Sequence, residues 1–140
     1  MRLFYFQIIV LFLFSITKGL AQNHLWSFNI GGGLDDVGRM TFNDNKGFVY
    51  AVGHFKGGNI DFNQSPTATT YLSSNGDMDA YVVKYTDAGV LVWAFNVGGS
   101  DLDEANAISV DNLGNVYVTG FFRGSNVDFD PSSTGTAFSI

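Results

Sequence analysis

Ala107-Ile-Ser-Val-Asp-Asn-Leu-Gly-Asn-Val-Tyr-Val-Thr-Gly-Phe-Phe122 has an earlier copy in the chain, Met40-Thr-Phe-Asn-Asp-Asn-Lys-Gly-Phe-Val-Tyr-Ala-Val-Gly-His-Phe55, at a constant displacement of 67 residues. With that displacement held fixed, 17 of the 37 positions from 26 to 62 are identical to their counterparts, without a gap. Self-similarity at a fixed period of this size is typical of repeat architectures. The chain therefore contains an internal duplication.

Each copy predicts two β-strands joined by a tight turn. In the first copy the turn is Asp44-Asn45-Lys46-Gly47. Asp at the first turn position can accept backbone hydrogen bonds, and Gly at the fourth tolerates a positive φ. The returning segment, Phe48 to His54, has apolar residues on both alternating faces, as in a strand that is covered on both sides. Its partner is expected around Met40 to Phe42.

The segments that flank this hairpin predict further strands. Leu25 to Ile30 alternates between apolar and polar residues and ends at a glycine run, which is typical of a strand with one buried face. Ala80 to Tyr85 and Val90 to Val97 predict a second hairpin around the turn 86–89. No window after Gln22 has helical periodicity of useful length.

The two hairpins of one unit are separated by a polar connection, Lys56 to Asp77. It contains glycine pairs, a proline and a threonine-rich patch, and two short extended pieces are expected in it, at 60–62 and 71–72. One unit thus holds about four strands joined as two hairpins. A repeated four-stranded meander of this kind predicts an all-β fold of β-propeller blades. A β-solenoid is the competing architecture, although its coils are usually shorter and lack two hairpins.

The second copy resembles a known family. Val92-Trp-Ala-Phe-Asn-Val-Gly-Gly99, Asp111-Asn-Leu-Gly-Asn-Val-Tyr-Val-Thr-Gly120 and Val127-Asp-Phe-Asp-Pro131 together look like the SBBP repeat of bacterial β-propellers. The first copy departs from this pattern, with Phe48 where the second has Asn, and with Asn63-Gln64 where the second has Asp-Pro. The resemblance implies a propeller fold and an exported or surface-associated location. It implies no activity, because the family is not defined by a catalytic site.

Repeat 1 is assigned to residues 26–92 and repeat 2, which is incomplete, to residues 93–140, so that the propeller region spans 22–140. About two blades are fewer than the four to eight with which propellers usually close. Unpaired strand edges and exposed aromatic faces would favour association. We therefore expect an N-terminal fragment of a longer protein or a truncated product, with a homo-oligomeric ring as the less favoured alternative.

The first 21 residues have the three-part pattern of a secretory signal peptide. Met1-Arg2 is a short basic start, Leu3 to Thr17 is mostly apolar, and Gly19-Leu20-Ala21 places small residues at the cleavage site before Gln22. The apolar run is shorter than a membrane-spanning helix requires. The sequence thus predicts a secreted protein, extracellular or at the cell surface, with the periplasm as an alternative, and no stable membrane anchor after cleavage.

Composition narrows the classes of partner. The 140-residue chain has a net charge of −6 and no cysteine. An acidic surface does not favour nucleic acid, which requires clustered lysine and arginine. Without cysteine, disulfides and thiolate metal sites are excluded. A protein or carbohydrate ligand remains the expected partner.

Acidic residues are the main candidates for chemistry. Asp101 to Glu104 and Asp128 to Asp130 can supply oxygen ligands for calcium, but their spacing does not match the twelve-residue loop of an EF-hand. Capping of turns through backbone hydrogen bonds is the favoured interpretation of these residues. No motif selects a carboxylate pair for glycoside hydrolysis.

No catalytic, cofactor-binding or metal-ligating residue is assigned, and no cofactor is predicted. His24 and His54 do not form a metal pair, and core packing is favoured over sugar stacking for Trp26 and Trp93. The leading hypothesis is an exported, non-catalytic scaffold or interaction module that presents loops for protein or carbohydrate binding. The alternative is the N-terminal part of an extracellular, polysaccharide-degrading propeller enzyme whose catalytic residues lie outside this chain.

Overall fold

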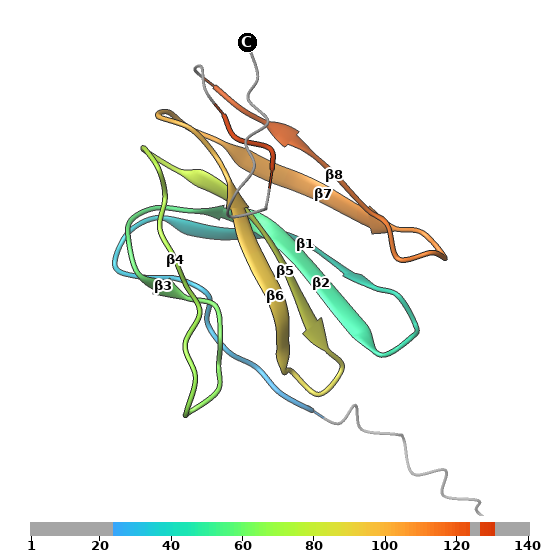
Figure 1. Ribbon diagram of the computed structural model, residues 1–140. Coiled ribbons are helices and arrows are strands. Elements are labelled where there is room, and N and C mark those ends of the chain that lie inside the picture. The colour runs from blue at the N-terminus through green and yellow to red at the C-terminus, as the bar shows by residue number, and fades with distance from the viewer. Residues whose placement is uncertain (1–23, 124–126, 131–140) are drawn as a thin grey trace, which may run out of the picture.

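The computed structural model describes residues 24–123 and 127–130 (Figure 1). The predicted leader, 1–21, and the end of the second repeat, 131–140, lie outside the described residues. Within the described part the regular structure is all β, as predicted. It consists of eight strands: β1 (Asp36–Asn43), β2 (Phe48–Phe55), β3 (Ile60–Asp61), β4 (Tyr71–Leu72), β5 (Asp79–Thr86), β6 (Leu91–Val97), β7 (Glu104–Val110) and β8 (Val116–Phe121).

The largest element is a four-stranded antiparallel sheet in the order β1-β2-β5-β6. Both predicted hairpins are therefore confirmed, and they pair with each other through β2 and β5, with Val52 opposite Val82. The two short pieces expected in the polar connection form the β3–β4 ribbon, a separate two-stranded sheet. This meander is the blade predicted from the repeat. It extends from Asp36 to Val97 and so crosses the predicted repeat boundary at 92/93.

The β7–β8 hairpin reproduces β1–β2 down to its irregularities. The register shifts between Gly38 and Met40 in the first hairpin, and at the equivalent place, between Ala105 and Ala107, in the second. A bulge of this kind leaves one residue unpaired and increases the local twist. The bulge at equivalent positions shows that the two copies share their backbone conformation there as well as their sequence.

Glycine is required opposite each of these bulges. A Cβ atom added at Gly53 would lie 1.9 Å from the carbonyl oxygen of Val37, and one added at Gly120 would lie 2.0 Å from that of Glu104. The two glycines are equivalent in the repeat. Their recurrence therefore follows from a close backbone approach, and not from turn formation.

The sheet buries apolar side chains on both faces, because successive residues of a strand point to opposite sides. On one face, Tyr50, Val52 and Val82 pack with Ala105 and Ile108 of the β7–β8 hairpin. Figure 1 shows this hairpin beside the sheet, away from the β3–β4 ribbon. The prediction that β2 is covered on both sides is thereby confirmed.

On the other face, a second cluster joins the sheet to the ribbon and to the segment before β1. Its buried members are Phe55, Ile60, Phe62, Tyr81, Val83 and Tyr85. The Tyr85 hydroxyl donates a 2.7 Å hydrogen bond to the backbone carbonyl of Phe62, which fixes the segment after β3 against β5. Phe28 and Ile30 pack on the outside of this cluster.

The prediction of a strand at Leu25 to Ile30 is wrong, because this segment is in no hydrogen-bonded strand. Its alternation is nevertheless present, with Trp26, Phe28 and Ile30 partly buried and the residues between them exposed. The equivalent segment one repeat later is β6, which is a strand because it pairs with β5. Among the described residues no strand pairs with Leu25 to Ile30. The segment is held by side-chain packing and by a 3.3 Å hydrogen bond that the Gln64 side-chain amide donates to the Asn29 carbonyl.

Candidate functional site

The acidic residues that recur in the repeat accept hydrogen bonds from backbone N–H groups. Asp36 accepts hydrogen bonds from the backbone N–H groups of Gly32, at 2.7 Å, and Lys56, at 3.3 Å. Its counterpart Asp103 accepts them from Gly99, at 2.8 Å, and Arg123, at 3.0 Å. Each carboxylate therefore joins the glycine turn before a hairpin to the end of that hairpin.

A second recurring pair caps the hairpin turns. Asp44 accepts from the N–H groups of Lys46 and Phe48, and Asp111 accepts from those of Leu113 and Asn115, all between 2.8 and 3.1 Å. The Asn115 side-chain amide also donates to Asp111 at 2.8 Å. Led by this bond, the hydrogen bonds lower the pKa of Asp111 from its ordinary value.

The third pair lies at β3 and its counterpart. Asp61 accepts hydrogen bonds from the N–H groups of Asn63 and Thr70, both at 2.9 Å, and Asp128 accepts one from Asp130 at 3.0 Å. Carboxylates that accept several backbone N–H bonds act as turn caps. Of the two interpretations of Asp103 and Asp128, the geometry supports capping. In residues 24–123 and 127–130, no group of three His, Asp or Glu side chains is placed to hold a metal ion.

Two other acidic groups have different surroundings. Glu104 lies 3.2 Å from the Arg39 guanidinium and 3.9 Å from Nδ1 of His54, which is buried and makes no hydrogen bond there. Asp101 accepts a 2.9 Å bond from the N–H of Leu102. The Glu104 cluster joins β1 and β2 to β7 and therefore connects the two repeats. Sequence reasoning did not find it, because none of the three residues recurs in the other copy.

Asp79 is a buried carboxylate that the repeat did not reveal. Its side chain is fully buried and accepts hydrogen bonds from the Asn75 N–H, at 3.1 Å, and the Asn96 amide, at 2.6 Å. Burial raises its pKa, and the hydrogen bonds oppose that shift. Because a Cβ atom at Gly98 would lie only 2.2 Å from the Asp79 carboxyl carbon, the recurrent glycine makes room for this side chain.

Both tryptophans pack against aromatic neighbours, as expected. Trp93 stacks on Phe95, with ring centroids 5.4 Å apart, and meets Tyr50 edge-on at 6.0 Å. Trp26 stacks on Phe28 at 5.1 Å and donates from its indole nitrogen to the carbonyl of Asp87 at 2.8 Å. His24 is exposed. Sugar stacking therefore gains no support at either tryptophan.

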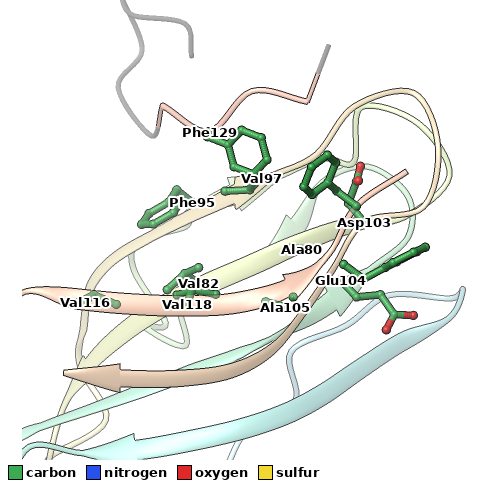
Figure 2. A pocket seen from close by; sticks show the side chains of 13 residues that line it. Ala80, Val82, Phe95, Val97, Asp103, Glu104, Ala105, Val116, Val118 and Phe129 are labelled. Carbon is green, nitrogen blue, oxygen red and sulfur yellow. The ribbon is translucent and has the colours of Figure 1, made fainter. Parts of the chain in front are cut away.

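An apolar cavity lies between the sheet and the β7–β8 hairpin (Figure 2). This cavity has a volume of about 390 Å³. It is lined by Ala80, Val82, Phe95, Val97, Asp103, Glu104, Ala105, Val116, Val118, Gly120, Phe121, Phe122 and Phe129. Such a lining favours an apolar or aromatic side chain over a charged ligand.

Next to the cavity, β8 and the segment after it expose large apolar side chains. Tyr117 is 56% exposed, Val118 41%, Phe121 43%, Phe122 49% and Phe129 43%. Of these, Val118, Phe121, Phe122 and Phe129 also line the cavity, whereas Tyr117 does not. Exposed apolar surface around a cavity is typical of interaction sites. The described residues contain no helix that is long and apolar enough to span a membrane.

Comparison with known proteins supports the repeat assignment. Residues 95–120, from the middle of β6 to β8, match the family model described as the SBBP beta-propeller repeat. An uncharacterized WD repeat-containing protein of Acanthamoeba polyphaga mimivirus is 26% identical over 115 residues, which cover 81% of this chain. The chain spans only 8% of that relative's length. No solved structure matches.

Proposed function

We propose that this chain of SBBP-type β-propeller repeats is an exported, non-catalytic interaction module that presents loops to a protein or carbohydrate ligand. The observation that carries the proposal is the use of the recurring carboxylates. Asp36, Asp44 and Asp61 and their counterparts cap the backbone at equivalent places in the two copies. The recurring residues thus stabilise the framework of the blades. Ligand recognition is assigned to the loops that connect the capped turns.

The connection between β2 and β5 is the best candidate for such recognition. It is held at its base, where Gly57 and Asn59 donate to the side chains of Ser74 and Ser73 at 3.1 and 3.0 Å. An ion pair between Lys56 and Asp77 closes it at the sheet. Tyr71 of β4 is 56% exposed. Because these contacts already hold the loop in place, little conformational entropy is lost when its exposed aromatic side chain binds a ligand.

Export is tested with the native leader. The full chain is produced in a bacterium beside a variant that lacks residues 1–21, and each product is followed by immunoblotting of cells and medium. We expect the full chain outside the cytoplasm, with its N-terminus at Gln22 by mass spectrometry. A full-length product retained in the cytoplasm would contradict export.

Ligand presentation is tested on a glycan array and, for proteins, by crosslinking on intact cells. Tyr71→Ser should lower binding about tenfold, because it removes aromatic contact area from the loop. Leu113→Ser, at an exposed position in the β7–β8 turn, is the matched control and should bind as the unmodified chain does. Equal binding by Tyr71→Ser would place recognition elsewhere, and hydrolysis of an arrayed glycan would favour the enzyme alternative.

A further inference from the structure

The bend between β4 and β5 contains Asn75-Gly76, the one place in the sequence where glycine follows asparagine. In such a pair the backbone nitrogen of the glycine can attack the side-chain amide of the asparagine. Glycine favours this attack because it has no Cβ atom to hinder the approach and adopts a wide range of backbone conformations. Asparagine is for such reasons a thermolabile residue. The pair is therefore a candidate site of spontaneous covalent change.

The structure leaves the reacting groups of this pair accessible. Asn75 and Gly76 are both exposed, and no described residue accepts a hydrogen bond from the Gly76 N–H. The Asn75 side-chain amide donates one bond, to the carbonyl oxygen of Gly98 at 3.4 Å, which is longer than usual for such a bond. The attacking nitrogen is thus unengaged, and the leaving amide is weakly held.

The asparagines of the hairpin turns have different surroundings. Asn45 and Asn112 are also exposed, but each precedes a larger residue. The backbone N–H groups of those residues, Lys46 and Leu113, each donate a 2.8 Å bond to the aspartate that caps the turn. The nitrogen that would attack is therefore already hydrogen-bonded at both turns. This difference selects Asn75 among the exposed asparagines.

We propose that Asn75 is a site of spontaneous deamidation that the fold does not protect. Hydroxide removes the proton from the Gly76 nitrogen, which attacks Cγ of Asn75. The N–Cγ bond forms, the Cγ–Nδ2 bond breaks, and ammonia leaves with a proton from water, which regenerates the hydroxide. Water then opens the cyclic imide at Cγ to give aspartate, or at the backbone carbonyl to give isoaspartate. The sum consumes one water and releases one ammonia, without an oxidant or cofactor.

Isoaspartate lengthens the main chain by one atom at a place that is fixed on both sides. Before the bend, the N–H of Ser74 donates a 2.8 Å backbone bond across the base of the β2–β5 connection. After it, the carbonyl of Met78 accepts a 2.8 Å bond from the N–H of Asp103. Gly76 itself lies so close to Ser100 that an added Cβ atom would be 2.4 Å from its carbonyl carbon. The extra atom must displace one of these contacts and so loosen the connection.

Both products also add a negative charge beside a buried carboxylate. Asp79 is fully buried and accepts the backbone N–H of residue 75 at 3.1 Å. A second carboxylate so near disfavours the ionised form of Asp79. Aspartate therefore destabilises the bend by charge alone, and isoaspartate by charge and by chain length. This inference goes beyond the proposed function and needs no ligand, so its failure would leave the proposed ligand loop untouched.

The reaction is followed by mass spectrometry of the full chain after incubation at mildly alkaline pH. Trypsin releases residues 57–84 as one peptide, which contains Asn59, Asn63 and Asn75. Deamidation replaces an amide by a carboxyl group, and fragmentation of the peptide locates the resulting change in mass. We expect modification at Asn75, with Asn59 and Asn63 intact as internal controls because larger residues follow them.

A free peptide with the sequence of residues 71–80 measures the reaction without the fold. The rate in the folded chain should lie within about tenfold of the peptide rate, because the bend need not open for the reaction to occur. Asn75→Gln should remain unmodified over the same period, since its longer side chain must close a six-membered ring. Asn112→Gln is the matched control and should deamidate at Asn75 as the unmodified chain does.

The structural effect is measured after the products are separated by chromatography. The isoaspartate form should unfold at a midpoint about 5 °C below that of the fresh chain, and protease should cleave its β2–β5 connection faster. Asn75→Asp adds the charge without the extra atom and should lower the midpoint less. Incubated Asn75→Gln should keep the midpoint of the fresh variant, which excludes other damage.

Three outcomes would overturn the inference. A rate in the folded chain about a hundredfold or more below the peptide rate would show that the bend protects Asn75. Equal modification at Asn59 or Asn63 would show that the Asn75-Gly76 bend has no special reactivity. An isoaspartate form as stable as Asn75→Asp would show that the contacts around the bend accommodate the longer chain.

Discussion

Asp103 accepts a 2.8 Å hydrogen bond from the backbone N–H of Gly99 although its side chain is almost completely buried. The same carboxylate accepts a second bond, at 3.0 Å, from the N–H of Arg123. One side chain therefore satisfies two backbone donors at opposite ends of a hairpin. Asp36 does the same in the first repeat, but is less buried.

Removal of these carboxylates should destabilise the chain unequally. Asp103→Ala leaves the buried N–H of Gly99 and the part-buried N–H of Arg123 without an acceptor, so we expect a loss of about 2–4 kcal/mol in the free energy of unfolding. Asp36→Ala, at a partly exposed site, should cost about 1 kcal/mol, because water can replace the lost acceptor. Urea unfolding followed by tryptophan fluorescence measures both. An Asp36 variant as unstable as the Asp103 variant would contradict this burial argument.

The glycine opposite the first bulge should not tolerate a methyl group. Gly53→Ala places a Cβ atom 1.9 Å from the Val37 carbonyl oxygen, so strands β1 and β2 must separate or the bulge must move. We expect a loss of about 3 kcal/mol or failure to fold. Gly33→Ala is the matched control, because no atom lies within 4 Å of its added Cβ. Comparable losses in the two variants would show that the clash is relieved elsewhere.

The repeated part of the fold could be predicted from the sequence because its signals are local. Asp44 to Gly47 and its counterpart both specify a tight turn that is capped by its aspartate, and strand alternation places Tyr50 and Val52 on one face. The capping role favoured for Asp103 likewise follows from a short-range pattern, since its first donor is only four residues away. Because the repeat is displaced by 67 residues, each strand, turn or cap predicted in the first copy is also predicted at the equivalent position of the second.

Non-local contacts could not be predicted in this way. Leu25 to Ile30 has strand alternation, but its pairing depends on a neighbour that the described chain does not supply. The Arg39–Glu104 ion pair joins residues 65 apart that are not equivalent in the repeat. The cavity beside β8 brings together residues that are far apart in the sequence, such as Val82 and Val118, and no local pattern records that contact.

Replacement of His54 by the residue of the second repeat should stabilise the chain. His54 is 4% exposed and its Nδ1 makes no hydrogen bond, whereas the counterpart is Phe121. His54→Phe removes an unsatisfied buried polar atom and should raise the free energy of unfolding by about 1 kcal/mol. The reciprocal Phe121→His, at an exposed position, should change it by less than about 0.5 kcal/mol. A loss of stability in His54→Phe would show that the contact with Glu104 outweighs the unsatisfied nitrogen.

Calcium should leave the unfolding midpoint unchanged. The oxygens of Asp103 and one oxygen of Asp128 accept backbone N–H groups, so binding of a cation would require these caps to open. We expect a shift of less than about 1 °C at about 5 mM calcium, since a ligand that binds only weakly adds little by mass action. Thermal unfolding with calcium, and with a chelator as the control, measures the shift. An increase of several degrees that the chelator reverses would revive the calcium interpretation.

The buried carboxylate of Asp79 should make stability depend on pH with a definite sign. Burial raises its pKa in the folded state above the ordinary value of 3.8. Between the unfolded and folded pKa values the native state binds more protons, so the contribution of Asp79 to stability is present below 3.8 and is lost as pH rises through the folded pKa.

Asp79→Asn removes this titration, so the variant should gain stability relative to the unmodified chain between about pH 3 and pH 7. Asp111→Asn is the control of opposite sign. The pKa of Asp111 is lowered in the folded state. The contribution of Asp111 to stability is therefore present above pH 3.8 and is lost as pH falls through the folded-state pKa. Urea unfolding of the three proteins across this pH range gives the two difference curves. Parallel curves of the same sign would show that burial does not control the titration of Asp79.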